Sequence, residues 1–587
     1  MNNGTIYLIK KELKEYPNKQ FLFRPSRSYP EYPFKQYISK ERNQVYEMVR
    51  ECLMMMELDI PHLGSEEWNP LGDFISPGDT VLLKPNMVLH YNPSGCGTDC
   101  LYTNPSIVAA IVDYVWIALK GRGKIVIGDA PLQECDFEVL CNESGYNELV
   151  EFYRQRGIEI ELLDFRNIKT YEASGLHYLQ TEKKWDGIIV KLNEKSAFAE
   201  LSPDRIKKLR ITNYDPKILQ KHHYGHVHEY NIAKPVLDAD VIINIPKPKT
   251  HRKAGVTISL KNLVGINANK EFLPHHTLGS KNEGGDAYLF SNDLLRMANQ
   301  VLDIKNELIH DNKMEIATLA NKLYTKLLEE GCSATNEQYW EGSWYGNDTI
   351  WRTILDLNRI LLYADKNGNL TDKKQRKIFI VGDMIVSGQK EGPLEPSPIY
   401  PGIIAMGDNP LNFDRAICSI MGFNYCDVPS LSSKMESNVL SIWNNQSIEI
   451  ISNFELWNKK NIDIIVENSL EFQPTEGWKE KLRNRYREKI YKQLRESKTS
   501  VYIFGAGING IYAKKELIKN GINVIAFCDN NTDLWGKEII DGIKCISLNN
   551  TDKCIKYVVA VKEKYTKEIT EQIINYGGEV VGIINKN

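Results

Sequence analysis

The sequence predicts a multidomain α/β protein whose main body is built on a mostly parallel sheet. Between residues 71 and 430, short apolar runs typical of buried strands alternate with helical patterns. The chain has 587 residues, more than one hydrophobic core normally supports. Residues 499–587 carry a separate pattern of strand, glycine-rich turn, helix and strand, which predicts a small second α/β domain.

Four regions follow from shifts in composition and periodicity. Residues 1–70 form a lead-in segment, whose amphipathic stretch Glu41–Leu58 predicts a helix packed on the body. Residues 71–430 form the α/β body, with expected insertions at 165–230 and, mostly helical, at 280–350. Residues 431–498 form a connecting region that ends in a charged helix, WKEKLRNRYREKIYKQLRESK, and residues 499–587 form the Rossmann-like domain.

Within the body, the predicted strands are Thr80–Leu83, Lys124–Gly128, a run beginning at Val241, and Lys377–Val381, with a helix at Ser106–Leu119. Continuous apolar runs are typical of central strands in a parallel sheet. Open α/β sheets bind ligands just beyond the carboxyl ends of such strands. Polar residues that follow these strands are therefore candidate site residues.

Composition restricts the class of partner. The formal net charge is −3, and no long basic stripe is interleaved with aromatic residues, so nucleic acid is not expected as a partner. The N-terminus is polar and no segment reaches the ~18 apolar residues of a membrane span, so we expect a cytoplasmic protein. The 11 cysteines are scattered, which suits reduced thiols. Oligomerisation stays open.

The most informative stretch is VIINIPKPKTHRKAGVTISLKNLVGI, residues 241–266. A buried-type strand is followed by a loop that Pro246 and Pro248 stiffen, which lowers the entropy cost of holding its side chains in place. The loop carries five potential cations: Lys247, Lys249, His251, Arg252 and Lys253. We expect an anionic ligand there, and the alternative is a solvated basic loop.

Other polar residues follow the predicted strands. Lys84 and Asn86, in LLKPN, offer a cation and an amide to a phosphate or carboxylate on a backbone that Pro85 restricts. Asp129 ends its strand, where it would hold a sugar hydroxyl, a metal or a lysine, or else cap a helix. Lys261 brings a further cation to the same segment as the basic loop.

His251 is the expected acid–base group, because imidazole titrates near neutrality and neighbouring lysines would push its proton off. The alternative is a structural histidine. Asp383 and Lys390 follow another strand, and Asp408 is a candidate ligand of a divalent metal. His276 precedes an acidic, glycine-rich stretch that we expect to fold over the pocket as a lid.

The tail carries SVYIFGAGINGIYAKKELIKNGINVIAFCDNN, with Gly505, Gly507 and Gly510 in G-x-G-x-x-G spacing. Such glycines allow a tight turn and close approach of the backbone to a phosphate at a helix N-terminus. Asp529 ends the second strand, where a carboxylate would bond a ribose hydroxyl. The candidate cofactors are a nucleotide, a nucleotide-sugar or NAD, and a purely structural role is the alternative.

This tail resembles the small Rossmann-like modules of polysaccharide-biosynthesis proteins, including the N-terminal domain of sugar acyltransferases of the PglD type. The matching residues are GAGINGIYAKKEL and FCDNNTDLWGKEIIDGIKCIS, with Asp529, Trp535, Gly536 and Gly542 on the pattern of the family. The resemblance implies a nucleotide-sugar ligand in some relatives and an accessory role in others.

The body resembles the uncharacterised DUF362 family over about residues 75–425. Three groups of motifs carry the resemblance: VLLKPNMV followed by Thr103-Asn104-Pro105; IPKPKTH with TISLKNLVGI; and VGDMIVSGQKEGP with MGDNPLNFDRAICSIMGFN. The family has no general activity from which chemistry follows. The ferredoxin-like cysteine clusters frequent in the family are missing here, which argues against iron–sulfur electron transfer.

Together these motifs predict a site. The expected catalytic residues are His251, Lys249, Lys84 and Asp383. The expected substrate-binding residues are Asn86, Thr103, Asn104, Asp129, Lys247, Thr250, Lys261, Asn262, His276 and Lys390.

The expected function is that of an enzyme acting on a phosphorylated or carboxylated, sugar-related substrate in bacterial surface-polysaccharide biosynthesis, with the reaction type open. One alternative is an NAD-dependent oxidoreductase or an epimerase or racemase. Another is a non-catalytic nucleotide-sugar-binding or scaffold protein of a glycan-assembly pathway.

Overall fold

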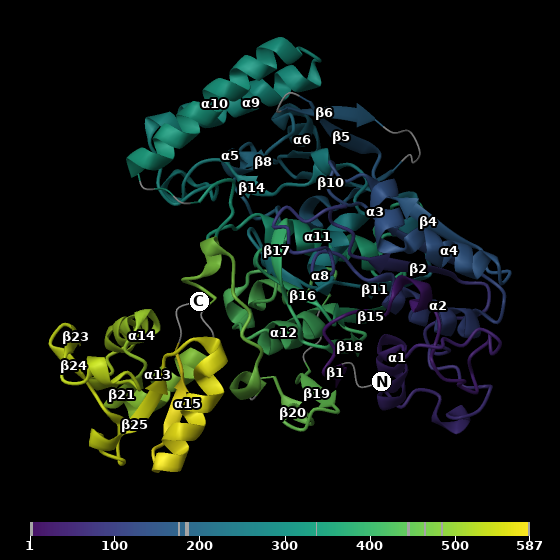
Figure 1. Cartoon of the computed structure of the whole chain (residues 1–587). Helices are drawn as coiled ribbons and strands as arrows, with labels where there is room; N and C mark the ends of the chain where they lie inside the picture. Colours follow the sequence, from purple (N-terminus) through teal and green to yellow (C-terminus); the bar gives the residue numbers. More distant parts are fainter. Residues whose placement is uncertain are drawn as a thin grey trace. The chain divides into compact units, whose positions relative to one another are not determined.

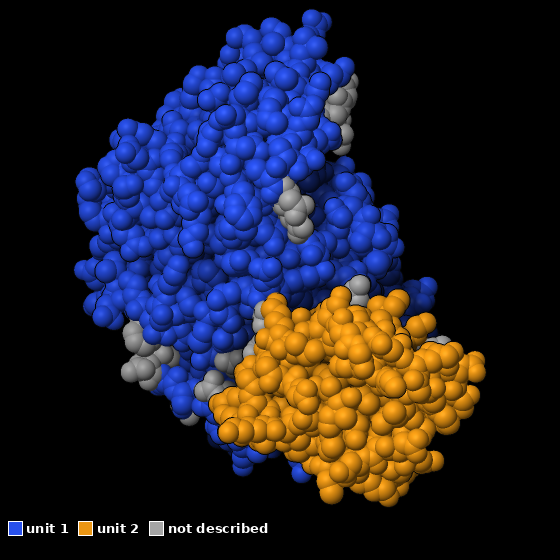
Figure 2. Space-filling model, turned by 90° about the vertical axis from the view of Figure 1, so that its left-hand side faces the viewer, with its two compact units in different colours: residues 1–482 blue, residues 483–587 orange. Residues whose placement is uncertain are grey.

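The computed structural model describes residues 4–173, 176–181, 187–335, 337, 339–442, 446–462, 465–482 and 485–584. The chain forms two compact units, residues 1–482 and 483–587, which we describe separately (Figures 1 and 2). The expected fold class is confirmed, because both units combine mostly parallel sheets with helices.

The first unit is built on a nine-stranded sheet with the order β20-β19-β1-β18-β15-β11-β2-β3-β4. In that order the strands are Lys460–Asn461, Glu449–Ser452, Thr5–Lys10, Ile403–Gly407, Lys377–Met384, Val241–Ile245, Thr80–Pro85, Lys124–Asp129 and Ile160–Asp164. The segments before residue 71 and after residue 430 thus supply β1, β19 and β20 to the same sheet as the body.

Both faces of the central strands are buried, which explains their continuous apolar runs. Alternate residues of each strand point to opposite faces, so Ile243 contributes to one hydrophobic core and Ile242 to the other. The first core includes α1 (Gln44–Met55), α2 (Pro105–Leu119) and α4 (Tyr146–Arg154). The second includes α8 (Ser259–Asn262), α11 (Ile350–Tyr363) and α12 (Pro410–Ile420).

Strand direction decides which residues share an edge of the sheet. β2 pairs in parallel with β3 and with β11, and β11 pairs in parallel with β15. The carboxyl ends of these four strands therefore lie along one edge. β18 runs antiparallel to β15, so its carboxyl end lies at the opposite edge.

Smaller elements surround the first edge. One four-stranded sheet has the order β13-β12-β16-β17, with strands Gly255–Thr257, Lys249–His251, Ser387–Glu391 and Glu395–Ile399. The polar stretch after β4 forms the hairpin β5–β6 (Ile168–Ala173 and Leu176–Thr181) and the sheet β7-β10-β9 (Ile188–Lys191, Val227–Ile232 and His223–Tyr224). Helices α9 (Asp293–His310) and α10 (Met314–Thr335) pack side by side, as Figure 1 shows.

The second unit has a six-stranded sheet with the order β23-β24-β22-β21-β25-β26. Its strands in that order are Glu538–Ile540, Ile543–Ile546, Val524–Cys528, Val501–Phe504, Lys556–Val559 and Val580–Ile583, and its helices are α13 (Arg485–Glu496), α14 (Ile508–Lys519) and α15 (Glu563–Tyr576). All pairs except β23–β24 are parallel. The parallel strands thus follow the doubly wound order in which the first strand lies centrally.

The charged helix predicted from Trp478 onward is shorter in the structure: α13 covers Arg485–Glu496, Trp478 ends a separate 3-10 helix, and Arg483 and Asn484 fall outside the described residues. Within the part of the chain that the structure describes, no helix combines the length and apolar character needed to cross a membrane.

Candidate functional site

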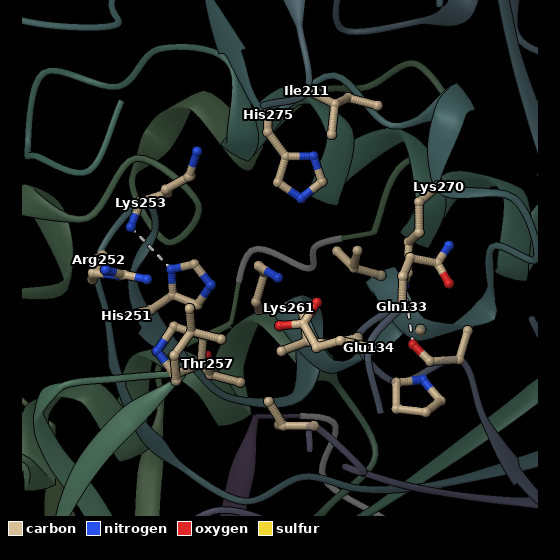
Figure 3. Close-up of a pocket in the computed structure, with 18 of the residues that line it drawn as sticks. Gln133, Glu134, Ile211, His251, Arg252, Lys253, Thr257, Lys261, Lys270 and His275 are labelled. Atoms are coloured by element: carbon tan, nitrogen blue, oxygen red, sulfur yellow. Dashed lines mark hydrogen bonds between the residues drawn. The ribbon is translucent and has the colours of Figure 1, made fainter. Parts of the chain in front are cut away.

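A cavity of about 330 Å³ opens at the edge of the sheet where β2, β3 and β11 end. Figure 3 shows its walls: His251, Arg252 and Lys253 lie on one side, Gln133 and Lys270 on the other, and His275 points in from above. The volume is within the ordinary range for small-molecule sites, about 300–1,000 Å³.

The buried ion pair between Lys84 and Asp129 anchors this edge of the sheet. Lys84 Nζ lies 2.6 Å from Asp129 Oδ1 and also donates to the Pro85 carbonyl oxygen at 2.9 Å. Asp129 accepts the backbone N–H groups of Met87 at 2.6 Å and Ala130 at 2.8 Å. Burial lowers the pKa of Lys84, and the carboxylate opposes that shift. The pair therefore fixes the loops after β2 and β3.

Gly265 completes this anchor because it leaves room for the carboxylate. A Cβ atom at this position would lie 1.9 Å from Asp129 Oδ1 and 3.0 Å from Lys84 Nζ. The Gly265 carbonyl oxygen accepts the Ala130 N–H at 3.0 Å. Close backbone approach thus explains the glycine in the motif TISLKNLVGI.

Lys249 and Asn86, which follow different strands in the sequence, contact each other in the cavity lining. Lys249 Nζ donates to Asn86 Oδ1 at 2.5 Å and also to the Leu101 carbonyl oxygen. Burial, and next the charge of Lys247, lower the pKa of Lys249 well below its usual value. Its amine is therefore held by neutral oxygen atoms and not by a carboxylate.

His251 is held as a neutral imidazole with a defined tautomer. Its Nδ1 accepts the backbone N–H groups of Lys253 at 3.0 Å and Ala254 at 3.1 Å, so the ring proton is assigned to Nε2. Burial, followed by the charges of Lys261 and Arg252, lowers the pKa of His251 well below 6.5. His251 thus offers an N–H donor to the cavity.

His275 has the complementary tautomer. Its Nδ1 lies 2.7 Å from the Leu273 carbonyl oxygen, which can only accept, so the proton is assigned to Nδ1 and Nε2 carries a lone pair. Burial, with the charges of Lys253 and Lys261, lowers the pKa of His275 to about 3. The cavity therefore contains one neutral imidazole that donates and one that accepts.

Basic side chains outnumber carboxylates in the cavity lining. Among the described residues that line it, five are Lys or Arg and three are Asp or Glu. The cations are Lys249, Arg252, Lys253, Lys261 and Lys270, and the acids are Asp129, Glu134 and Glu341. Asp129 is already paired with Lys84, and Glu341 lies 3.1 Å from Lys253 Nζ.

Burial lowers the pKa of two of these lysines into the physiological range. The pKa of Lys261 falls to about 8, because desolvation and the charges of Lys84 and Lys253 outweigh Asp129. The pKa of Lys270 falls to about 7, again chiefly by desolvation, and its Nζ donates to the Ala130 carbonyl oxygen at 3.0 Å. An anion in the cavity would favour the charged form of both amines.

Comparison with known proteins gives the family of this chain. A family model described as "Domain of unknown function (DUF362)" matches residues 81–190 and 190–419, which is more than half of the chain. The chain belongs to the DUF362 family. The resemblance of the body is therefore confirmed, and the matched residues include every strand end that forms the cavity.

One curated relative of this DUF362 protein is the "Thylakoid-associated protein sll1697" of Synechocystis sp.. The two sequences are 27% identical over 195 residues, which cover 33% of this chain and 41% of the relative. The match therefore spans less than half of the relative's length.

Two predicted site residues of the DUF362 body form a second buried ion pair, outside the cavity lining. Lys247 Nζ lies 2.6 Å from Asp383 Oδ2, and Tyr16 contacts both, donating to Asp383 Oδ1 at 2.6 Å and accepting from Lys247 at 2.5 Å. Asp383 also accepts the Asn104 N–H at 2.9 Å. This pair joins the ends of β11 and β15 to the start of α2.

Four further predicted residues of this DUF362 protein hold the backbone around the site. The Thr103 hydroxyl donates to the Ile245 carbonyl oxygen at 2.7 Å, and Asn104 caps α2. Thr250 donates to the Lys390 carbonyl oxygen at 2.8 Å. Asn262 lines the cavity and donates to the Lys84 carbonyl oxygen at 3.1 Å.

Three predicted residues lie away from the cavity. Lys390 is exposed in the hairpin β16–β17. Asp408 follows β18 and lines a different hollow, because that antiparallel strand ends at the opposite edge of the sheet. His276 is buried beside the cavity residue His275, and its Nδ1 has no hydrogen-bond partner within the described residues. His275, Lys270 and Glu134 line the cavity instead, without having been predicted.

Within the described residues, no group of three or more His, Cys, Asp or Glu side chains is placed to share a metal ion. The predicted metal ligand Asp408 therefore has no such cluster around it in the described part of the protein.

The glycine loop of the second unit has two glycines that are required and one that faces open space. A Cβ at Gly505 would lie 2.3 Å from the Ala560 carbonyl oxygen, and one at Gly510 would lie 1.8 Å from the Gly505 carbonyl oxygen. A Cβ at Gly507 would meet nothing within 4 Å. Asp529 accepts the Ala506 N–H at 2.9 Å, so its carboxylate closes the loop.

Proposed function

We propose that the first unit is an enzyme that binds a small molecule carrying phosphate or carboxylate groups in the cavity at the carboxyl ends of β2, β3 and β11. The observation that carries this proposal is the surplus of cationic side chains over carboxylates in the lining. Buried charges are costly unless they are paired, so an anionic ligand would stabilise this arrangement.

The two neutral histidines support proton transfer as the reaction type. His251 presents an N–H that would polarise a carbonyl or hydroxyl oxygen, as a neutral imidazole is able to do. His275 presents a lone pair that would accept a proton. This combination favours an epimerase, racemase or isomerase step on an anionic substrate.

Binding of sulfate and of sugar phosphates, followed through the melting temperature of the full chain, tests the proposal. A ligand at a hundred times its Kd adds about 2.7 kcal/mol of stability. We expect Lys270→Met and Arg252→Met each to weaken binding by about tenfold or more, or about 1.4 kcal/mol. Lys124→Met, at the exposed start of β3, is the matched control and should bind as wild type. Equal affinity in all four proteins would contradict the proposal.

For the second unit we propose that the loop between β21 and α14 binds the nucleotide part of a nucleotide-sugar, with NAD as the competing ligand. The doubly wound strand order and the open space at Gly507 support this. A PglD-type module in this position would favour the surface-polysaccharide setting expected from the sequence. We expect a nucleotide to raise the melting temperature of the wild-type chain but not that of Gly507→Trp.

A further inference from the structure

Lys261 differs from the other lysines around the cavity because its amine has no hydrogen-bond or ion-pair partner among the described residues. No hydrogen bond or ion pair joins Lys261 Nζ to any residue of the described chain. The four other lysines there each donate to an oxygen atom of the protein: Lys84 to Asp129, Lys249 to Asn86, Lys253 to Glu341 and Lys270 to the Ala130 carbonyl. Figure 3 shows Lys261 in the middle of the cavity, between the wall of His251 and that of Lys270.

The carboxylate that most favours the charged form of Lys261 is that of Asp129, which is not free to hold this amine. Asp129 is engaged by Lys84 Nζ and by the N–H groups of Met87 and Ala130. The titratable groups that face Lys261 from the surrounding elements are mostly cationic or neutral: Lys84, Asp129, Glu134, Lys249, His251, Arg252, Lys253, Lys270, His275 and Glu341.

These surroundings keep a large share of Lys261 uncharged near neutral pH. With the pKa lowered to about 8, the neutral fraction at about pH 7.5 is roughly a hundredfold or more above that of an ordinary lysine. A desolvated lysine with a lowered pKa is the form that attacks carbonyl carbon.

We propose that Lys261 forms an imine with an aldehyde or ketone ligand that also carries a phosphate or carboxylate group. The inference rests on the proposed anion site and names its substrate class. The Nζ lone pair forms a bond to the carbonyl carbon, and the resulting carbinolamine loses water. The two hydrogen atoms of the amine leave with the former carbonyl oxygen as that water, and Nζ stays bonded to carbon through a double bond.

The neighbouring residues fit this step. The Nε2–H of His251 is a donor that would polarise the carbonyl oxygen during attack. Arg252 and Lys253 on one wall and Lys270 on the other would hold the anionic group. The lone pair of His275 would then take a proton from the carbon next to the imine, which connects Lys261 to the proposed proton transfer.

Trapping with pyridoxal 5′-phosphate tests the inference, because this probe joins an aldehyde to a phosphate. The full chain is incubated with the probe at about pH 7.5, reduced with sodium borohydride, and mapped by peptide mass spectrometry. We expect one reduced pyridoxyl group, on Lys261. Pyridoxal, which lacks the phosphate, should label it at least about tenfold more slowly, equivalent to about 1.4 kcal/mol of phosphate interaction. Sulfate should compete.

Lys305 provides the matched control. Burial also lowers its pKa to about 8, but it lies on α9 over the Tyr324 ring and does not line the cavity. The pyridoxyl label should disappear in Lys261→Arg, and Lys261 should still be labelled in Lys305→Arg. Label spread equally over Lys305 and surface lysines of the wild-type chain would overturn the inference, whether or not the variants fold.

The sulfate measurement separates this inference from the proposed function. Stabilisation by sulfate with no label on Lys261 would overturn the imine and leave the anion site standing. If sulfate does not stabilise the protein and Lys261 is not labelled, both the anion site and the imine are overturned.

Discussion

At the scale of single residues, the main distinction is between lysines that hold the structure and lysines that face the cavity. Lys84 and Lys247 are completely buried, and each lies 2.6 Å from a carboxylate. Removing one partner of such a pair leaves the other charge buried and uncompensated, which costs far more than the pair itself contributes. We therefore expect substitution of either lysine to lower the stability of the fold more than it weakens ligand binding.

Lys84→Met tests that distinction. It leaves Asp129 without its cation, so we expect the free energy of unfolding to fall by about 3–5 kcal/mol. Urea unfolding followed by tryptophan fluorescence measures the change. Adding Asp129→Asn to Lys84→Met should recover part of the loss, because the buried charge is then removed. Lys124→Met should lie within about 0.5 kcal/mol of wild type. A Lys84→Met protein as stable as that control would refute the structural role.

The neighbours His275 and His276 show what single-residue reasoning from the sequence misses. The sequence indicated His276 as a substrate-binding residue, but its neighbour His275 lines the cavity. Adjacent residues in an extended segment point in opposite directions, so a shift of one position changes the residue that faces the cavity. Nothing in the local pattern of apolar residues fixes that choice.

At the scale of elements, the predicted strands and helix were located well because their apolar runs are buried on both sides. The predicted helix Ser106–Leu119 is α2, and the predicted strand Thr80–Leu83 is the start of β2. Strand direction was not predictable in the same way. Asp408 was a candidate metal ligand of the site, but β18 runs antiparallel and carries it to the other edge. The hairpin β16–β17 that precedes β18 gives no local sign of that reversal.

The close contacts in the glycine loop between β21 and α14 limit which substitutions the loop tolerates. Gly510→Ala places a Cβ against the Gly505 carbonyl oxygen, so we expect the second unit to lose at least about 2 kcal/mol, as overpacking of a close contact does. The side chain introduced by Gly507→Trp starts in open space, so this variant should have the melting temperature of wild type. Calorimetry of the full chain measures both.

Gly507→Trp also tests nucleotide binding by the loop. A nucleotide-sugar or NAD should raise the melting temperature of wild type and leave Gly507→Trp unchanged, because the indole would occupy the place of the phosphates. Stabilisation that survives in Gly507→Trp would place the nucleotide elsewhere or assign the second unit a structural role.

At the scale of the whole molecule, the cavity depends on segments that are far apart in the sequence. The Lys84–Asp129 pair needs β2 and β3 to be neighbours, and the contact of Lys249 with Asn86 needs the loops after β2 and β11 to meet. The sequence identified these residues by their strand ends but not by their partners. The side of the cavity formed by His251, Arg252 and Lys253 also depends on Trp478, whose indole N–H donates to the Arg252 carbonyl oxygen at 2.7 Å. Trp478 lies within residues 431–498, which the sequence indicated to be a connecting region.

The lowered pKa values of Lys261 and Lys270 make the ligand-free molecule sensitive to pH. A lysine whose pKa is lower in the folded state than its ordinary value of 10.5 binds its proton less well when folded. Its contribution to stability is therefore present above about pH 10.5 and is lost as pH falls through about 8 for Lys261 and about 7 for Lys270. Below about pH 7 both amines are charged, and neither is paired with a carboxylate among the described residues.

An anion bound in the cavity reverses this penalty. Sulfate stays doubly charged across the range and favours the protonated amines, so its binding should take up protons above about pH 7. Its affinity should fall by about tenfold per pH unit for each lysine that must be protonated. Calorimetry at about pH 6, 7.5 and 9 in buffers of different ionisation enthalpy measures the affinity and the proton uptake. Lys270→Met should lose the part of the proton uptake that begins near pH 7, while Lys124→Met keeps it. A sulfate affinity that stays constant from about pH 6 to 9 would mean that these two lysines do not contact the anion.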